Sequence, residues 1–309
     1  MSSKIRENLK NNEAIVRTYD KFKEFYYRHV ISDEELIRKK FKKRLGREVD
    51  LENPIKFNDK LQWLKLNWHD PVATKCADKY EVREIIKEKI GEEYLNELIG
   101  VYESVDEINI DELPEKFVLK GTHGSGFNII CKDKNELNWD LEFKKMRRWL
   151  KNNYYLSNRE WVYRDIKPRI ICEKYLEEFE TGELRDYKIF CFNGEPKVIE
   201  VDFDKFKNHK RNFYDLDWKF INGEIKYPND SSVNIQKPEK LSEMLNLSRI
   251  LSVGFPHVRV DFYYLNNQIM FGELTFFHES GMGSFRPEDF EVEMGKWLEL
   301  PITTGGNKK

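Results

Sequence analysis

Apolar residues recur every three or four positions in several parts of this 309-residue chain, and that spacing is typical of amphipathic helices. Residues 12–43 follow the pattern first, before a turn at Asn53-Pro54, and a shorter helix is expected at residues 58–67. We therefore predict a helical N-terminal cap over residues 1–75. Further helices are predicted at residues 78–86, 135–155, 238–251 and 287–298.

Short runs of β-branched and aromatic residues predict strands in the rest of the chain. A strand, a tight loop and a second strand are expected within residues 117–130. Asn193-Gly194 is the strongest kind of short-range hairpin signal, and it joins two predicted strands. These two strands are predicted at residues 185–192 and 196–203. Three further strands are predicted at residues 168–176, 258–262 and 271–276.

The last predicted hairpin has two registers. If Asn266-Asn267 forms a two-residue turn, Asp261 lies opposite Gly272, and Glu273 points to the other face of the sheet. If the loop has three residues, with an asparagine in the left-handed conformation, Asp261 lies opposite Glu273. The sequence pattern favours the second register because it separates an apolar face from a polar face.

In that second register the polar face carries Arg259, Asp261, Glu273 and Thr275. Two facing carboxylates repel each other unless a cation joins them. We therefore predict bound magnesium between Asp261 and Glu273, since carboxylates are ligands that magnesium accepts. A surface hairpin with salt-bridged acids is the alternative interpretation.

The predicted loop within residues 117–130 combines Lys120 with Gly121, Gly124 and Gly126. Glycines let a backbone approach an anion with its N–H groups exposed, and a neighbouring lysine adds a positive charge. The motif fits a phosphate-binding loop, and it also fits a plain β-turn beside a surface lysine.

The predicted helix at residues 78–86 begins with Asp78 and Glu81, which fit an acidic variant of a capping box. Lys79 would then stand at the first helical position. A helix N-terminus favours anions, so Lys79 and the helix end could face one phosphate. An exposed surface lysine is the alternative.

Composition excludes several classes of protein. Of the residues, 39% are hydrophobic and 35% charged, and the net charge is -2, so no nucleic acid partner is expected. The four cysteines are far apart and form no C-x-x-C pair, which argues against a zinc site and a disulfide framework. No apolar run is long enough to span a membrane, and the first 30 residues lack a signal-peptide core. We expect a cytoplasmic protein.

Positive charge is concentrated near the N-terminus. Residues 1–47 carry fourteen Lys and Arg against seven Asp and Glu, with a cluster at Ile37–Arg47. A solvated helix face explains such a cluster, and a peripheral contact with a membrane or with an anionic, even lipid-linked, acceptor is the other interpretation. Two interpretations also exist for a second basic group, Lys207, Lys210 and Arg211. These residues could contact an anionic acceptor or belong to a solvated loop.

Taken in order, these stretches resemble the ATP-grasp superfamily, and most closely its TupA-like group, which is linked to teichuronopeptide and capsule synthesis. The resemblance extends from about Lys42 to Leu298. Its motifs are PIKFNDKLQWLKL (54–66), ADKYEVREII (77–86), the Gly-rich region 117–132, ICEKYL (171–176), RDYKIF (185–190) and the region 257–281.

The resemblance implies an α+β ATP-grasp fold in which two subdomains with antiparallel sheets clasp ATP. The first subdomain would be residues 76–172, the second residues 173–301, and residues 302–309 a flexible tail. It also implies site residues. For ATP they are Lys79, Lys120, Thr122, His123, Gly124, Ser125, Gly126, the hinge Glu173, Lys174, Tyr175 and Leu176, and Lys188. Arg259 and Lys120 would be catalytic, and Asp261, Glu273 and Thr275 would hold Mg²⁺.

Two positions depart from the family pattern. Many members have asparagine where Thr275 stands, and a hydroxyl is a weaker metal ligand, which affects the second metal. A proline is also frequent near the position of His278, which belongs to a second Gly/Ser-rich loop, residues 278–284. As a lone motif that loop fits an anion site or a plain connection.

For function, the resemblance implies that ATP activates a carboxylate as an acyl phosphate, which an amine then attacks to form an amide. The group points to a sugar acid, such as a uronic acid of a surface polysaccharide, joined to an amino acid or small amine. A sugar kinase-like phosphotransferase and a non-catalytic polysaccharide-binding protein are the competing hypotheses. The sequence does not identify the sugar, the amine or the oligomeric state.

Overall fold

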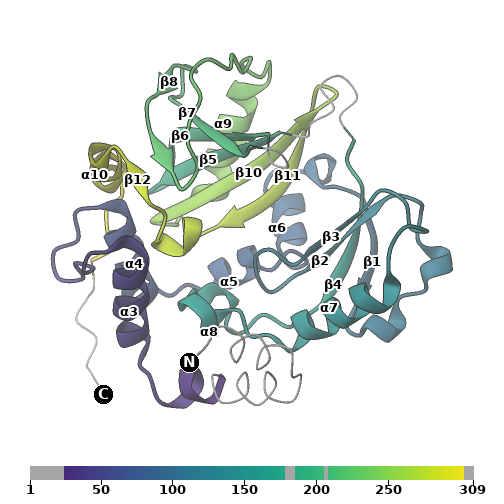
Figure 1. Ribbon diagram of the computed structural model, residues 1–309. Helices are drawn as coiled ribbons and strands as arrows, with labels where there is room; N and C mark the ends of the chain where they lie inside the picture. The colour runs from purple at the N-terminus through teal and green to yellow at the C-terminus, as the bar shows by residue number, and fades with distance from the viewer. Residues whose placement is uncertain (1–23, 178–184, 205–207, 303–309) are drawn as a thin grey trace.

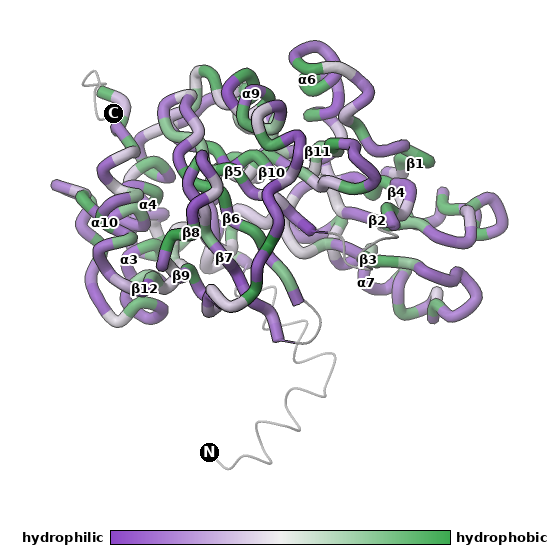
Figure 2. Tube along the Cα trace, turned by 90° about the horizontal axis from the view of Figure 1, so that it is seen from above, coloured by the Kyte–Doolittle hydropathy of each residue, from purple (hydrophilic) through white to green (hydrophobic). Residues whose placement is uncertain are grey.

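Two antiparallel sheets, of four and six strands, dominate the computed structural model, which describes residues 24–177, 185–204 and 208–302. Figure 1 shows the four-stranded sheet, from the middle of the chain, beside the six-stranded sheet, from its C-terminal half. In Figure 2, seen from above, the strands of the two sheets again lie in different parts of the molecule. The two sheets therefore occupy different regions of the molecule.

The four-stranded sheet has the order β1-β4-β2-β3. Its strands are β1 (Leu98–Tyr102), β2 (Phe117–Gly121), β3 (Asn128–Cys131) and β4 (Ile170–Lys174). Helix α7 (Trp139–Lys151) packs against it, and Met146 joins Phe117 and Leu119 in one buried cluster. The predicted strand, loop and second strand within residues 117–130 are confirmed. The predicted boundary after residue 172 falls inside β4, and the division into subdomains stays a prediction.

The six-stranded sheet has the order β11-β10-β5-β6-β7-β8. Its strands are β5 (Asp186–Phe192), β6 (Glu195–Phe203), β7 (Lys210–Tyr214), β8 (Phe220–Ile221), β10 (His257–Leu265) and β11 (Gln268–Thr275). Asn193 and Gly194 have φ angles of 51° and 86°, as a type I′ hairpin turn requires, so this hairpin is confirmed. Helix α9 (Leu241–Ser252) contacts β5, β6 and β10.

The other elements surround these sheets. Helix α4 packs against α10 and against η5, a short turn near the C-terminal end of β11. The helices are α3 (Asp33–Leu45), α4 (Phe57–Asn67), α5 (Pro71–Ala77), α6 (Val82–Lys89), α8 (Tyr155–Asn158) and α10 (Glu288–Trp297). A two-stranded ribbon joins β9 (Glu224–Ile225) to β12 (Phe285–Arg286). The 3₁₀ turns are η1 (Glu92–Tyr94), η2 (Val105–Glu107), η3 (Ile110–Glu112), η4 (Trp161–Tyr163) and η5 (His278–Gly281).

The described part of residues 12–43 is not one continuous helix. Residues 24–29 are helical, and α3 then begins anew after Ser32. The Ser32 hydroxyl accepts a hydrogen bond from the Glu35 N–H, and the Glu35 carboxylate accepts one from the Ser32 N–H, which is a capping box. Residues 1–23 and 303–309, most of the predicted tail, lie outside the described residues. Within the described ranges, no helix is long and apolar enough to cross a membrane.

The predicted capping box at Asp78 is wrong. The Asp78 carboxylate accepts a hydrogen bond from the Tyr80 N–H at 2.8 Å, so it closes a turn, and α6 begins only at Val82. Glu81 forms an ion pair with Arg169 at 3.0 Å instead of reaching back to Asp78. Lys79 therefore lies in the turn before the helix and not at its first position.

The loop between β10 and β11 is shorter than the favoured register assumed. Leu265 pairs with Gln268, so the turn consists of Asn266 and Asn267 alone, with φ angles of 49° and 58°. The prediction of a three-residue loop is wrong, because two successive asparagines in the left-handed region form the tight turn without a third residue.

Candidate active site

A β-bulge decides which polar side chains of β10 and β11 face each other. Asp261 lies opposite Glu273 and Arg259 opposite Thr275, as the favoured register predicted, because Gly272 is an extra residue in β11. A Cβ atom on Gly272 would lie only 3.0 Å from the Asp261 carbonyl oxygen, so the close approach of the strands favours glycine. The polar face is thus created by the bulge and not by the loop.

These polar residues line a cavity of about 530 Å³ between the two sheets. Side chains reach it from β2, β5, β7, β10 and β11, from the loop before β3 and from η5. Its charged residues are Arg44, Lys79, Lys120, Glu160, Asp186, Lys188, Arg211, Lys226, Arg259, Asp261, Glu273 and Glu279. A cavity with this many charges of both signs suits a highly charged ligand.

On the four-stranded side, two lysines reach the cavity from different elements. The Lys120 ammonium lies 2.6 Å from the Glu173 carboxylate, which also pairs with Arg83 at 3.3 Å. Lys79 donates a hydrogen bond to the Gly124 carbonyl oxygen at 2.9 Å and lies 3.6 Å from Glu273. Lys79 therefore connects the Gly-rich loop to β11 of the other sheet.

The Gly-rich loop divides its residues between the cavity and the protein interior. Ser125 and Gly126 line the cavity. Thr122 and His123 are buried; the His123 ring donates a hydrogen bond to the Trp149 carbonyl oxygen at 2.7 Å and lines a neighbouring cavity instead. A Cβ atom on Gly124 would lie 2.8 Å from the Tyr154 ring, so glycine is needed for the loop to pack there.

The predicted hinge follows β4 and lies mostly outside the main cavity. Glu173 borders a small cavity together with Lys79 and Lys120. The Lys174 side chain is exposed and pairs with Glu97 at 3.2 Å. Tyr175 and Leu176 are half-buried and do not line the main cavity. Adenine binding at this segment stays a prediction.

Arg259 is the centre of the polar face of β10 and β11. Its guanidinium donates to both Asp261 carboxylate oxygens, at 2.7 and 2.5 Å, and to the Thr275 hydroxyl at 3.1 Å. Burial raises the pKa of Asp261 to about 7, against the opposing effect of Arg259. For Glu273, burial acts in the same direction, but Lys79 and Arg259 outweigh it and hold the pKa at about 2.

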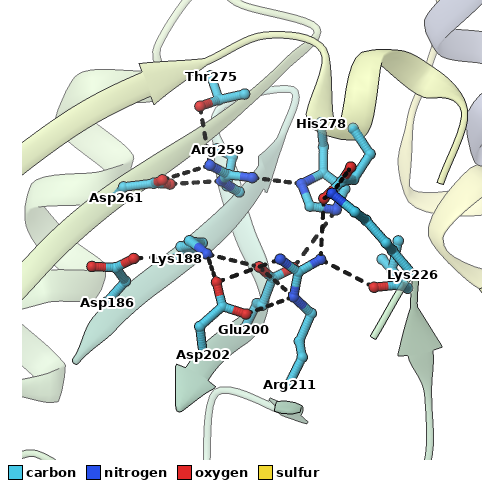
Figure 3. Close-up of polar contacts among 12 residues, drawn as sticks. Asp186, Lys188, Glu200, Asp202, Arg211, Lys226, Arg259, Asp261, Thr275 and His278 are labelled. Atoms are coloured by element: carbon cyan, nitrogen blue, oxygen red, sulfur yellow. Dashed lines mark hydrogen bonds and ion pairs between the residues drawn. The ribbon is translucent and has the colours of Figure 1, made fainter. Parts of the chain in front are cut away.

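Behind this face lies a buried network of charged residues, drawn in Figure 3. Lys188, one of the predicted ATP ligands, lines the cavity and pairs with Asp202 and, at 3.2 Å, with Glu200. Arg211 pairs with Asp202 at 2.8 Å and with Glu200 at 3.0 Å. Glu200 is fully buried. The network fixes the position of Lys188 at the cavity wall.

His278 connects that network to Arg259 (Figure 3). Its Nδ1 accepts a hydrogen bond from Arg259 Nη1 at 2.5 Å, and its Nε2 lies 3.7 Å from Glu200. Burial lowers the pKa of His278 well below its usual value, so the ring stays neutral and can accept this bond. The sequence analysis assigned no such role to His278, Glu200 or Asp202. Two acids at alternate positions of the otherwise apolar stretch 198–203 in β6 were the available signal.

The residues predicted to hold a metal form an oxygen-rich but small donor set. Asp261, Glu273 and Thr275 all line the cavity, and the described ranges contain no cluster of three or more His, Cys, Asp or Glu that could hold a metal. Magnesium commonly uses one or two protein carboxylates and takes its other ligands from phosphates and water. This donor set therefore fits magnesium that arrives with a phosphate ligand.

The chain resembles several solved structures at low identity. They include a D-alanine–D-alanine ligase from Bacillus anthracis complexed with ATP (17% identity, TM-score 0.38, 65% of this chain and 54% of that one). An N5-carboxyaminoimidazole ribonucleotide synthetase complexed with ADP is 16% identical, with a TM-score of 0.42, and the match covers 80% of this chain and 58% of that one. An L-amino acid ligase from Bacillus licheniformis is 12% identical, with a TM-score of 0.40, and the match covers 72% of this chain and 49% of that one. The chain thus spans about half to three-fifths of these proteins, and likenesses of this size say nothing about its substrate.

Among curated protein sequences nothing matches this chain. A family profile described as TupA-like ATPgrasp, however, matches residues 59–299. The matched region includes both sheets and every described side chain of the cavity except Arg44. Because the match covers well over half of the chain, the chain belongs to the TupA-like ATP-grasp family.

Proposed function

We propose that this chain is an ATP-dependent, ADP-forming ligase that joins a carboxylate to an amine. The observation that carries the proposal is one cavity where Lys79 and Lys120 from the four-stranded side meet Arg259, Asp261 and Glu273 from the six-stranded side. Opposed cations and carboxylates of this kind neutralise a transferred phosphoryl group and hold its metal.

The cavity residues would divide the work. Lys79, Lys120 and the backbone N–H groups around Ser125 and Gly126 would bind the ATP phosphates. Arg259 would neutralise the transferred phosphoryl group, and its bonds to Asp261 and His278 hold it in place. Asp261, Glu273 and Thr275 would hold Mg²⁺, which would neutralise negative charge on the phosphate groups when bound. The product of this step is an acyl phosphate on the acceptor.

For the acceptor we propose a sugar acid, such as a uronic acid, and for the second substrate an amino acid or small amine, within surface-polysaccharide synthesis in the cytoplasm. Membership of the TupA-like family supports this class of substrate. The basic residues Arg44 and Lys226 on the cavity wall also suit an anionic acceptor. Three further basic residues were considered at the sequence level: Arg211 is buried in the ion network, Lys210 pairs with Asp230, and Lys207 lies outside the described residues.

The substitution Glu273→Gln tests the proposal. It keeps the size of the side chain but removes one charge from the proposed metal site, so ADP release with Mg²⁺-ATP, a mixture of uronic acids and a mixture of amino acids should fall by about 100-fold or more. Thermal unfolding should show a folded protein.

The control for this experiment is Glu195→Gln in the same sheet, where the carboxylate pairs with Arg249 on the surface. This variant should release ADP at the wild-type rate. Unchanged turnover in Glu273→Gln would contradict the assignment of Glu273 as a metal ligand. A stable sugar phosphate formed without amine would show that the protein is a kinase and not a ligase.

A further inference from the structure

The turn η5 carries unusual backbone geometry at the cavity wall. Glu279 and Ser280, both non-glycine residues, have φ angles of 47° and 57°. Left-handed backbone at non-glycine residues is strained, and such strain collects at functional sites. Both side chains line the cavity. The same turn carries His278, which holds Arg259, so the strained residues lie close to the proposed phosphoryl-transfer site.

Glu160 contacts this turn at the cavity wall. It immediately precedes η4, is only 4% exposed and still lines the cavity. Its Oε1 accepts a hydrogen bond from the Ser280 hydroxyl at 2.6 Å. Among the described residues, its second oxygen has no hydrogen-bond or ion-pair partner within reach. A buried carboxylate that faces a cavity with one unshared oxygen is available to a ligand.

The surrounding contacts hold Glu160 in place without occupying that oxygen. Asn158 donates a hydrogen bond to the Ser280 hydroxyl at 3.0 Å. The buried Lys65 ammonium donates to the carbonyl oxygens of Asn158 and Ser280, at 2.9 and 2.8 Å, and makes no direct ion pair with Glu160. Three chain segments, around Lys65, residues 158–160 and Ser280, thus meet at this carboxylate.

Comparison with another buried glutamate shows what is different about Glu160. Glu173 lies at the opposite side of the site and has both oxygens paired, one with Lys120 and one with Arg83. Glu279 is also occupied, since Lys226 lies 2.9 Å from it. Burial raises the pKa of Glu160, against the charge of Lys65, and this makes its carboxylate a better proton acceptor.

We propose that Glu160 forms the subsite for the amine substrate, where it binds the ammonium group and removes one proton from it. The inference rests on the proposed ligase function, because it needs an acyl phosphate beside Arg259. The class of ligand is a primary amine, such as the amino group of an amino acid, and Ser280 is the residue that positions the carboxylate.

One ammonium proton passes to the free oxygen of Glu160, which leaves a neutral amine with a lone pair. That lone pair forms the C–N bond at the acyl phosphate, and the C–O bond to phosphate breaks with its electron pair. The second proton lost by the nitrogen leaves with inorganic phosphate. Glu160 returns its proton to solvent when the products leave.

Hydroxylamine separates this inference from the ligase proposal. It is largely uncharged at neutral pH, so it can attack an acyl phosphate without giving up a proton first. In Glu160→Gln, amide formation from amino acids should fall by about 100-fold or more, while hydroxamate formation from the same uronic acids should fall far less. Ser280→Ala keeps the carboxylate and should lower the amide-to-hydroxamate ratio in the same direction. Glu142→Gln, which changes a buried glutamate of α7 outside the cavity, should keep the wild-type ratio.

Equal losses of amide and hydroxamate in Glu160→Gln, or no loss at all, would overturn the amine subsite. Wild-type protein that gives neither ADP nor hydroxamate with any acid would instead speak against the ligase function. Labelling with a water-soluble carbodiimide and glycine ethyl ester then still tests Glu160, with peptide mapping as the readout. Glu160 should be labelled well before Glu173, which is slightly more exposed but has both carboxylate oxygens paired. Equal or slower labelling of Glu160 would contradict the proposal.

Discussion

The two sides of the cavity hold their charges in different ways. On the four-stranded side, the paired side chains of Lys120 and Glu173 are 19% and 9% exposed, and the pair borders a small cavity. On the six-stranded side, Arg211 and Asp202 are 4% and 3% exposed, and both belong to a network with Lys188 and a fully buried Glu200. One side offers cations that can exchange partners, and the other offers a fixed framework.

The difference suggests a division of tasks. A lysine paired with one carboxylate near solvent can turn to a phosphate when ATP binds and return when ADP leaves. The charges of the six-stranded side have no such freedom, because each buried ion depends on several partners. That rigidity would hold Arg259 where charge develops during phosphoryl transfer.

The largest effect is expected in the buried network. Asp202→Asn leaves Arg211 and Lys188 with one negative charge fewer, and breaking a buried ion pair costs roughly 3–5 kcal/mol. Urea unfolding should show a loss of that size in the free energy of unfolding. Glu195→Gln, on the same strand but in an exposed pair with Arg249, should cost at most about 1 kcal/mol. Similar losses in the two variants would break the contrast.

A smaller effect is expected on the four-stranded side, and on binding instead of stability. Lys120→Ala removes a charge-assisted contact with phosphate and should weaken ATP binding by roughly 1.5–3 kcal/mol, or about 10- to 150-fold. Titration calorimetry measures this directly. Lys116→Ala is the control, since Lys116 pairs with Glu177 at an exposed position. Equal affinities of wild type and Lys120→Ala would refute the phosphate contact.

The smallest effect concerns His257, which is fully buried on β10 among the rings of Phe57, Phe190 and Phe192. Burial lowers its pKa to about 3, whereas an unfolded histidine has a pKa of about 6.5. The stability due to neutral His257 is therefore complete above pH of about 6.5 and is lost as the pH falls towards the folded pKa.

Between pH 7 and pH 5.5 this histidine should account for about 1 kcal/mol of lost stability. Urea unfolding of His257→Phe at the two pH values should show a flatter dependence than wild type by that amount. His123→Phe, on the four-stranded side, should change the dependence in the same direction, since burial lowers the pKa of His123 too. An unchanged slope in His257→Phe would contradict the assignment.

Most of the fold could be predicted from local patterns in the sequence. The Gly-rich loop, the Asn193-Gly194 hairpin and the polar alternation around Arg259 depend on neighbouring residues, and the predicted ATP-grasp α+β fold is confirmed. Strand β1 was not predicted, because all five of its residues are half-buried and show no alternation. The bulge at Gly272 was also missed, since a strand glycine does not reveal which strand it approaches.

The candidate site could be predicted only in part. Lys79, Lys120, Lys188, Arg259 and Glu273 were named from motifs, and the structure brings them to one cavity. Whether they bind ATP stays a prediction. The cavity wall formed by Arg44, Glu160 and Ser280 was predicted only in part. The loop that carries Ser280 was considered as an anion site and the cluster that carries Arg44 as an acceptor contact, but Glu160 was not singled out. These residues belong to η5, to α3 and to the position before η4. These residues are far apart in the sequence and come together only through tertiary packing, so their spacing does not predict that they share a cavity.

Transfer of labelled oxygen tests the ligase account most directly. Uronic acids with ¹⁸O in the carboxylate would be incubated with the protein, Mg²⁺-ATP and amino acids, and the reaction followed by phosphorus NMR. An acyl phosphate intermediate predicts inorganic phosphate that carries one ¹⁸O atom and forms only when the amine is present. Unlabelled phosphate, or a stable sugar phosphate formed without amine, would contradict it.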